Sequence, residues 1–361
     1  MTSPAEPRPA GRANIVGVGL IGGSIGLALR DVGWHVNGTD LDPVRAAKAL
    51  ELGALDDIGT DLDADITFIA TSVGAIAGAA RTALAASGGA VTDVGSVKAP
   101  VIAEVNDPRF VGGHPMAGSE QEGVEGAQVD LFDGATWVLT PTLETDAEAY
   151  TTVRSVVRSL GAEVVALPPE RHDALVALVS HVPHLVAANL MALASEGAEE
   201  HAAVLRLAAG GFRDMTRVAA GNPGIWLDIC AENREAIVGA LDRLLAVIGA
   251  TRDMVDKSDR DGLLAALESA RVGRSNLPDQ VSHTGDLVEV RVPVPDRPGV
   301  LSEVTTLLGE MDVNIVDLEI AHSPEGGRGV VVFLVQATAG ERVHEALTAR
   351  RYRPSIRPLE Q

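Results

Sequence analysis

The sequence of 361 residues contains a single cysteine, Cys230. One cysteine cannot form an intramolecular disulfide, so the chain is suited to a reducing compartment. No stretch approaches the roughly 20 consecutive apolar residues of a membrane-spanning helix, and the Pro-rich start at residues 1–12 lacks the apolar region of a secretory signal. We therefore expect a soluble, cytoplasmic protein without a membrane partner.

Positive charge is also scarce. The chain has 29 Lys and Arg against 50 Asp and Glu, a formal charge of −21, and lysine occurs only at Lys48, Lys98 and Lys257. This charge repels nucleic acid and anionic membranes unless a basic stripe overrides it, and the sequence shows no such stripe. A nucleic-acid partner is therefore not expected. Hydrophobic residues make up 46% of the chain, enough for a sizeable core in two or three domains.

The first part of the chain, residues 13–168, alternates short β-rich runs with Ala- and Leu-rich helical patterns. Strands separated by helix-length segments predict a parallel sheet with helices on both faces. The fold class expected for this part is α/β, of the Rossmann type. The strands are expected at residues 13–18, 34–39, 66–70, 90–93, 109–112 and 136–140.

The pattern changes after Pro168. Residues 169–271 have helical periodicity without a convincing strand, which predicts an all-helical substrate and dimerisation domain with a wide apolar surface. A polar linker is expected over residues 272–286. Residues 287–358 alternate again in a βαββαβ order, which predicts a small ferredoxin-like domain.

A glycine-rich loop follows the first expected strand and opens a helix. In such loops the first glycine permits the tight turn, the second lets the backbone approach a pyrophosphate, and the third allows close helix packing. An acidic residue, Asp40, ends the second expected strand, where it can accept hydrogen bonds from the ribose of NAD and oppose a 2′-phosphate. Glycines also punctuate ordinary turns, but strand, helix and acidic residue agree here. We expect an NAD site formed by Gly17, Gly19, Leu20, Ile21, Gly22 and Asp40, with Thr71 and Ser72 after the third strand.

Polar residues also follow the fourth and fifth expected strands, at the edge where ligands of open parallel sheets bind. Ser96 alone is most simply an N-cap for the next helix, but its neighbours favour one shared crevice. His114 is flanked by glycines and Pro115, so we expect it in a loop beside the cofactor. A lone histidine is more often structural, yet this placement favours a catalytic role for His114.

The helical part contributes a Ser-His pair. Ser180 and His184 lie one helical turn apart, with Pro183 expected to disturb the helix between them. The pair indicates either a kinked core helix or a polar patch that faces the cleft, and the sequence leaves both open. A metal site is not expected, because one histidine pair lacks the acidic or thiolate ligands that would complete it.

A pair of arginines follows. Arg213 and Arg217 are one turn apart, with Asp214 between them. Surface arginines are usually solvated, but an arginine directed into a cleft is a natural bidentate partner for a carboxylate. Asp214 can then orient that arginine.

Together these motifs resemble the prephenate and arogenate dehydrogenases of tyrosine biosynthesis. They occur in the family's order and lie within about residues 13–270. The tail resembles an ACT domain, a regulatory module that binds amino acids. The matching segments are GVGLIGGS at 17–24, GSVK at 95–98, GHPMAG at 113–118, SHVPH at 180–184 and GFRDMTR at 211–217, with DRPG at 296–299 and VNI at 313–315 in the tail.

The resemblance implies NAD-dependent oxidative decarboxylation of prephenate, or of arogenate, by a homodimer. The two substrates differ by a keto or an amino group that no motif reads. The resemblance implies that His114 accepts the proton of the substrate's 4-hydroxyl, that Ser96 holds this hydroxyl, and that Arg217 binds a carboxylate. Trp226 matches a position that can approach the neighbouring subunit's site, or is a plain core aromatic. The expected residues of the substrate pocket are Ser180, His184, Glu120, Asp214 and Arg213. Because the implied substrate is anionic and the chain carries a net charge of −21, Arg217, Arg213 and Lys98 are expected to supply the positive charge at the site.

The ACT-like tail implies feedback inhibition by tyrosine. Backbone amides at the helix start beside Asp296 and Gly299 can bind the carboxylate of an amino acid, and Asn314 is a candidate partner for its ammonium. The alternative is a dimerisation module that binds no ligand.

Two other functions stay open at this point. A dehydrogenase of the 3-hydroxyacid type has a similar domain order but relies on a helix lysine, and Lys257 is the only lysine in the helical part. A catalytically silent regulator that binds NAD and an amino acid is disfavoured, because His114, Ser96 and Arg217 are all present.

Overall fold

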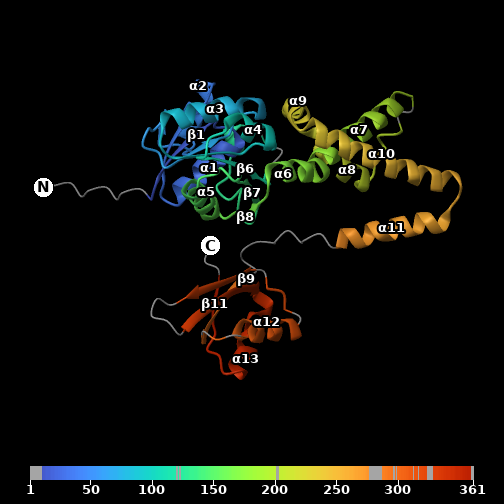
Figure 1. The fold of residues 1–361 in the computed structure, drawn as a ribbon. Coiled ribbons are helices and arrows are strands. Elements are labelled where there is room, and N and C mark those ends of the chain that lie inside the picture. Colours follow the sequence, from blue (N-terminus) through green and yellow to red (C-terminus); the bar gives the residue numbers. More distant parts are fainter. Residues whose placement is uncertain are drawn as a thin grey trace. The chain divides into compact units, whose positions relative to one another are not determined.

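A computed structural model describes residues 10–118, 121, 123–200, 203–275, 287–295, 297, 299–311, 313–315, 317–322 and 328–358. The chain divides into two compact units, Met1–Ala265 and Ala266–Gln361. The first unit holds a mixed α/β region followed by helices, and the second holds a small sheet with its own helices (Figure 1).

The first unit is built on an eight-stranded sheet in the order β3-β2-β1-β4-β5-β6-β7-β8. The hydrophobic run at β4 is buried at every position, as a central strand covered on both faces must be. Two short strands, β3 and β8, were not predicted. The strands are β1 (Arg12–Val16), β2 (His35–Thr39), β3 (Asp57–Ile58), β4 (Ile66–Ile69), β5 (Ala90–Asp93), β6 (Phe110–Pro115), β7 (Thr136–Thr140) and β8 (Glu163–Ala166).

The expectation of a purely parallel sheet is wrong at one pair, because β7 runs antiparallel to β6. Parallel neighbours need a crossover, usually a helix. Among the described residues between β6 and β7, the only helical element is a 3₁₀ turn at Val124–Gly126. The chain therefore returns alongside β6 in the opposite direction, and β8 then pairs parallel to β7.

Helices cover the sheet on both faces, as expected (Figure 1). A second apolar cluster ties the sheet to the helical region: Val73 at the start of α3 and Val97 after β5 pack with Ala177, Val182 and Ile229. The helices of the sheet region are α1 (Leu20–Asp31), α2 (Pro43–Glu51), α3 (Val73–Ala86), α4 (Ala99–Val105) and α5 (Ala147–Ser159).

The helical region begins with α6 (Pro169–Val176), which continues through a π-helical turn (Ala177–His181) into α7 (Val182–Glu200). The π turn ends two residues before Pro183, which has no N–H to donate to the preceding turn. It is followed by α8 (Gly210–Thr216), a 3₁₀ turn (Arg217–Ala220), α9 (Pro223–Glu232), α10 (Arg234–Asp256) and α11 (Arg260–Ser275).

Two sequence expectations change in this region. The α11 helix reaches Ser275, so residues 272–275 of the expected linker are helical, and residues 276–286 lie outside the described part. The helical stretch Pro169–Ala198 is long and apolar enough to cross a bilayer by length and composition alone. Core helices of soluble proteins pass the same test, and the start of this stretch packs on the sheet region.

The C-terminal unit has the expected βαββαβ order. Its antiparallel sheet runs β10-β11-β9-β12, the ferredoxin-like arrangement. Alternate valines of β9 and β11 pack with Val304 and Leu308 in a separate core. The elements are β9 (Leu287–Pro295), α12 (Val300–Glu310), β10 (Asp317–His322), β11 (Arg328–Gln336), α13 (Ala337–Ala349) and β12 (Ser355–Pro358). The sequence predicts a hairpin loop over residues 324–329, but residues 328–329 belong to β11, and residues 324–327 lie outside the described part.

Candidate active site

The glycine loop has the conformation that a dinucleotide site requires. Gly17 has a φ of +93°, and a Cβ there would strike the backbone of Ala70. A Cβ at Gly22 would collide with the Gly17 carbonyl oxygen, whereas the space beside Gly19 is open. Gly19 begins α1 without a side-chain cap, so its end of the helix presents free backbone amides to an anion. The first turn of α1 carries Leu20 and Ile21.

Asp40 holds this loop from the end of β2. Its Oδ2 accepts a hydrogen bond from the Val18 N–H at 3.0 Å, and its Oδ1 accepts one from the Asp42 N–H at 2.9 Å. The guanidinium of Arg45 lies 3.8 Å from Oδ1. Thr71 and Ser72 follow β4, and the backbone of Thr71 passes beside Gly17. These residues fit a bound NAD: a bare helix N-terminus for the pyrophosphate and a carboxylate at the ribose end.

His114 is not in a loop, which corrects the sequence expectation. It lies in β6, opposite Val138 of β7. The glycines before it enable this pairing, because a Cβ at Gly113 would come within 2.6 Å of the Asp93 carbonyl oxygen and one at Gly112 would meet Thr140. His114 thereby stands near the end of a strand, with a backbone more rigid than a loop would provide.

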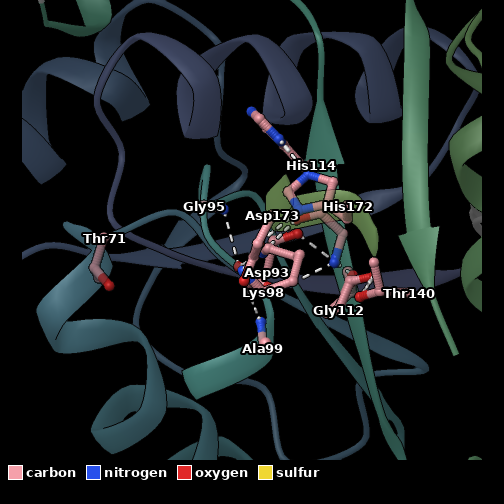
Figure 2. Close-up of polar contacts among 12 residues, drawn as sticks. Thr71, Asp93, Gly95, Lys98, Ala99, Gly112, His114, Thr140, His172 and Asp173 are labelled. Atoms are coloured by element: carbon pink, nitrogen blue, oxygen red, sulfur yellow. Dashed lines mark hydrogen bonds and ion pairs between the residues drawn. The ribbon is translucent and has the colours of Figure 1, made fainter. Parts of the chain in front are cut away.

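The side chain of His114 is part of a hydrogen-bonded chain (Figure 2). Its Nδ1 lies 2.9 Å from Nε2 of His172, and Nδ1 of His172 lies 2.8 Å from Oδ1 of Asp173. Asp173 also accepts hydrogen bonds from the backbone N–H groups of Lys98 (2.8 Å) and Ala99 (2.9 Å) at the start of α4. The chain therefore links β6, α6 and α4.

Burial lowers the pKa of His114 well below its ordinary value of 6.5, because the imidazolium is poorly solvated there. The positive charge of Lys98 and the neighbouring His172 and His181 act in the same direction. His114 is therefore neutral at physiological pH, as a proton acceptor must be.

Lys98 does not serve an anionic substrate directly, contrary to the sequence interpretation. Its side chain is fully buried, and Nζ is paired with the equally buried Asp93 and donates to the Gly113 carbonyl at 2.7 Å. Asp93 in turn accepts from the N–H groups of Gly95 (2.9 Å) and Gly113 (3.1 Å). Lys98 stabilises the strand ends that carry the site. Its positive charge acts on a ligand through the electrostatic potential and not through direct contact.

Ser96 lies between β5 and α4 and is half-buried. The α4 helix begins at Ala99 with Lys98 at its N-cap position, so the N-cap interpretation of Ser96 is wrong. Ser180 sits half-buried in the π turn. The Ser96 loop and this turn meet through the apolar cluster in which Val97 contacts the helical region.

His184 stacks on the indole of Trp226, with ring centroids 3.7 Å apart and planes 15° from parallel. The edge of His181 meets the same indole at 6.0 Å. Burial lowers the pKa of His181 to about 4, so it too is neutral. Nδ1 of His181 lies 3.2 Å from Nδ2 of Asn233, and this amide nitrogen also donates to the backbone carbonyl of Asp173 at 2.9 Å. The buried Nε2 of His181 has no hydrogen-bond partner among the described residues.

The arginine pair lies farther along, on α8 and the turn after it. Arg213, Asp214 and Arg217 are all exposed. The turn that starts at Arg217 packs on α7, and a Cβ at Gly221 would lie 3.9 Å from the His184 ring. Glu120 lies outside the described residues. The structure thus links His114 to His172 and Asp173 and places His181 and His184 against Trp226, while the expected arginines remain at the surface.

Sequence reasoning missed His172, Asp173 and Asn233. The available signal was the buried polar dipeptide His172-Asp173, placed on the inner face of the first helix after the domain boundary. Nothing local to Asn233 indicates its role, because its two partners come from α6 and the π turn.

Comparison with known proteins identifies the family of this chain. The profile of the prephenate dehydrogenase nucleotide-binding domain matches residues 25–166, that of the prephenate dehydrogenase dimerization domain matches residues 168–269, and that of the ACT domain matches residues 288–351. The prephenate dehydrogenase of Bacillus subtilis (strain 168) is 34% identical over 354 residues, which cover 93% of this chain and 95% of that protein. The chain belongs to the prephenate dehydrogenase family.

Solved structures of the family agree with this assignment. The prephenate dehydrogenase from A. aeolicus, in complex with hydroxyphenyl propionate and NAD⁺, shares 30% identity with a TM-score of 0.70, over 75% of this chain and 100% of that chain. Synechocystis arogenate dehydrogenase shares 31% identity with a TM-score of 0.64, over 73% and 99% of the two chains. The family resemblance and the three-part fold expected from the sequence are therefore confirmed.

Proposed function

We propose that this family member is an NAD-dependent prephenate dehydrogenase, which converts prephenate to 4-hydroxyphenylpyruvate in tyrosine biosynthesis. The observation that carries the proposal is a neutral His114, held by a buried hydrogen-bonded chain at the same sheet edge as the glycine loop. A dehydrogenase of the 3-hydroxyacid type would rely on a helix lysine, but Lys257 lies exposed at the end of α10. A catalytically silent regulator would have no use for a neutral proton acceptor at this position.

Each step of the proposed reaction is assigned to particular residues. Held by the glycine loop and Asp40, NAD would supply the hydride acceptor for C4 of the substrate ring. His114 takes the proton of the 4-hydroxyl and Ser96 positions that hydroxyl, so that electrons move toward the ring as the hydride leaves. Loss of CO₂ from C1 makes the ring aromatic, and the proton returns from His114 to the phenolate oxygen. Protons, electrons and carbon then balance without another reactant.

Most of the groups that surround the substrate in this proposal come from the helical region. We assign the binding of a substrate carboxylate to Arg217, with Arg213, Asp214 and Glu120 shaping the polar surroundings. Ser180, His184 and Trp226 line the pocket in this proposal. A guanidinium is needed because the substrate carries negative charge in a chain whose net charge is −21.

A rate assay tests the function. NADH formation is followed by absorbance with prephenate and with arogenate, each with NAD and with NADP. We expect turnover of prephenate with NAD. Turnover of arogenate alone would identify arogenate as the substrate. No turnover of either compound would favour the alternative of a catalytically silent regulator.

We expect the Asp40→Ser variant to narrow the preference for NAD over NADP. A carboxylate beside the 2′-position of the ribose favours a hydroxyl there and repels a phosphate. Once the carboxylate is removed, Arg45, whose guanidinium lies beside Asp40, can pair with the 2′-phosphate of NADP. The ratio of kcat/KM for the two cofactors measures this. Asp57→Ser, at an exposed carboxylate on the neighbouring β3, is the control with the same change of charge. Equal use of both cofactors by the unaltered enzyme would contradict the assignment of Asp40.

A homodimer and a cytoplasmic location complete the proposal. Large apolar side chains on α10, among them Leu245, Val247 and Ile248, are more than half exposed in the single chain. They lie within the region that matches the dimerization domain. A second copy of this surface would cover them.

Feedback inhibition by tyrosine is proposed for the C-terminal unit. Gly299 has a φ of +89° and begins α12 without a side-chain cap, which leaves backbone amides for a carboxylate. Asn314 is exposed just before β10. Asp296, the remaining candidate, lies outside the described residues.

Tyrosine is titrated against the initial rate of the full chain, of a chain ending at Ser275 and of the full-length Asn314→Ala variant. We expect sensitivity in the full chain that is lost on truncation and weakened by Asn314→Ala, because the ammonium loses its partner. Ser302→Ala, an exposed change on α12, is the control. Equal sensitivity with and without the tail would place tyrosine in the active site as a product mimic.

A further inference from the structure

We propose that His172 and Asp173 form a relay that sets the tautomer of His114 and receives positive charge when His114 takes up a proton. The inference rests on the proposed function for its chemical purpose, but the tautomer can be measured without any turnover. His172 and Asp173 are positioning residues in this proposal, because they act through His114.

The relay begins at Asp173, which is ionised. Oδ1 accepts from the Lys98 N–H and Oδ2 accepts from the Ala99 N–H, so both oxygens face backbone donors. A protonated carboxyl would bring one of these donors against its own O–H. The ammonium of Lys98, paired with Asp93, adds a positive field on the same side.

The ionised carboxylate determines the state of His172. A carboxylate only accepts hydrogen bonds, so Nδ1 of His172, 2.8 Å from Oδ1, carries the hydrogen. His172 is almost completely buried, and its histidine neighbours, His114 and His181, do not stabilise a cation there. In the resting state His172 is therefore neutral, and its Nε2 holds a lone pair.

That lone pair determines the state of His114. The 2.9 Å contact between Nε2 of His172 and Nδ1 of His114 needs one hydrogen, and only His114 can supply it. Nδ1 of His114 is thus the donor, and its Nε2 is the bare nitrogen. The atom that must accept the substrate proton is ready as an acceptor before the substrate arrives.

The same geometry provides a place for the charge. When Nε2 of His114 gains the hydroxyl proton, the Nδ1–H bond of His114 can break as an Nε2–H bond forms on His172. His114 is then neutral again, and the imidazolium is on His172, next to the carboxylate of Asp173 rather than facing Lys98. The reverse shift returns the proton to the phenolate, so no external acid or base is consumed.

Nitrogen NMR of histidine-labelled full-length enzyme tests the tautomer directly. The His114 signals are identified by their absence in His114→Asn. We expect a protonated Nδ1 and a bare Nε2 at neutral pH in the unaltered enzyme. In Asp173→Asn the carboxylate charge is lost, and an amide NH2 turned toward His172 donates to it, so we expect a population of His114 whose hydrogen lies on Nε2. A His114 protonated on Nε2 in the unaltered enzyme would overturn the relay even if the enzyme turns over prephenate.

Kinetics separate the two parts of the relay from a merely structural role. Asp173→Asn should lower kcat by about 10²–10⁴-fold with little change in the KM for prephenate, because the acceptor nitrogen is blocked. In His172→Gln, the amide oxygen still accepts from Nδ1 of His114 but cannot take up the charge, so we expect an intermediate loss of kcat with the tautomer retained. Asp242→Asn, an exposed carboxylate on α10, is the control.

The pH profile adds an independent readout. His172 lowers the pKa of His114 in the unaltered enzyme, so its replacement by a neutral amide in His172→Gln should move the acid limb of kcat to higher pH while the folded state, checked by circular dichroism, is kept. Unchanged kcat and an unchanged limb in both variants would reduce His172 and Asp173 to packing residues and overturn the proposal.

Discussion

The His114→Asn variant is expected to lose about 10²–10⁴-fold in kcat, the usual contribution of general acid–base catalysis. The amide is close to the imidazole in size and can keep a hydrogen bond to His172, but it has no nitrogen that accepts a proton. NAD binding should change little, because the glycine loop and Asp40 belong to β1, α1 and β2 rather than to β6. The measurements are steady-state kinetics with prephenate and titration of NAD by fluorescence.

The unaltered enzyme should also show the pKa of His114 in its pH profile. The reaction needs neutral His114, so kcat/KM is lost as the pH falls through that pKa. Because burial and the charge of Lys98 place this pKa well below 6.5, the acid limb lies below the range of an ordinary histidine, and activity is level above it. His344→Asn, in the C-terminal unit, is the matched control. Near-normal turnover in His114→Asn would remove His114 from the mechanism.

The second large effect concerns stability. Lys98→Met is expected to destabilise the sheet region by about 3–5 kcal/mol, the cost of leaving a buried charge without its partner. Asp93 would keep the N–H groups of Gly95 and Gly113 but would lose the Lys98 ammonium, in a position with no solvent exposure. Equilibrium unfolding in urea measures the change.

Two further variants make that test specific. Lys48→Met removes an exposed lysine, whose ion pair with Glu51 lies at 3.0 Å on the surface of α2, and should cost no more than about 1 kcal/mol. Adding Asp93→Asn to Lys98→Met should recover part of the loss, because the uncompensated charge is then gone. If Lys98→Met were as stable as Lys48→Met, the buried ion pair would not contribute to the fold.

Local pattern was a good guide wherever a structural element depends on its own residues. The strand at 90–93 and the one at 136–140 have the predicted bounds, and the glycine loop has the predicted turn, because a Cβ at Gly22 cannot be accommodated in that turn. The expected tail also formed, since its alternation of valines matches a half-buried sheet.

Pattern failed where a partner distant in sequence decides the outcome. His114 looked like a loop residue because glycine and proline surround it, yet β7 supplies hydrogen-bond partners that keep it in a strand. Lys98 looked like a ligand for an anion because positive charge is scarce, yet Asp93 and the Gly113 carbonyl surround its ammonium.

The sequence by itself determined the three-part fold and the NAD loop, because both follow from short-range spacing of residues whose shape or chemistry allows few alternatives, and it named His114 as the candidate proton acceptor. Only the tertiary structure decided which nitrogen of His114 is free. That depends on Asp173, whose two carboxylate oxygens accept hydrogen bonds from backbone amides at the start of α4, and on His172, which lies between Asp173 and His114. A proton's position is set by contacts among elements that are far apart in the chain, so no local pattern can encode it.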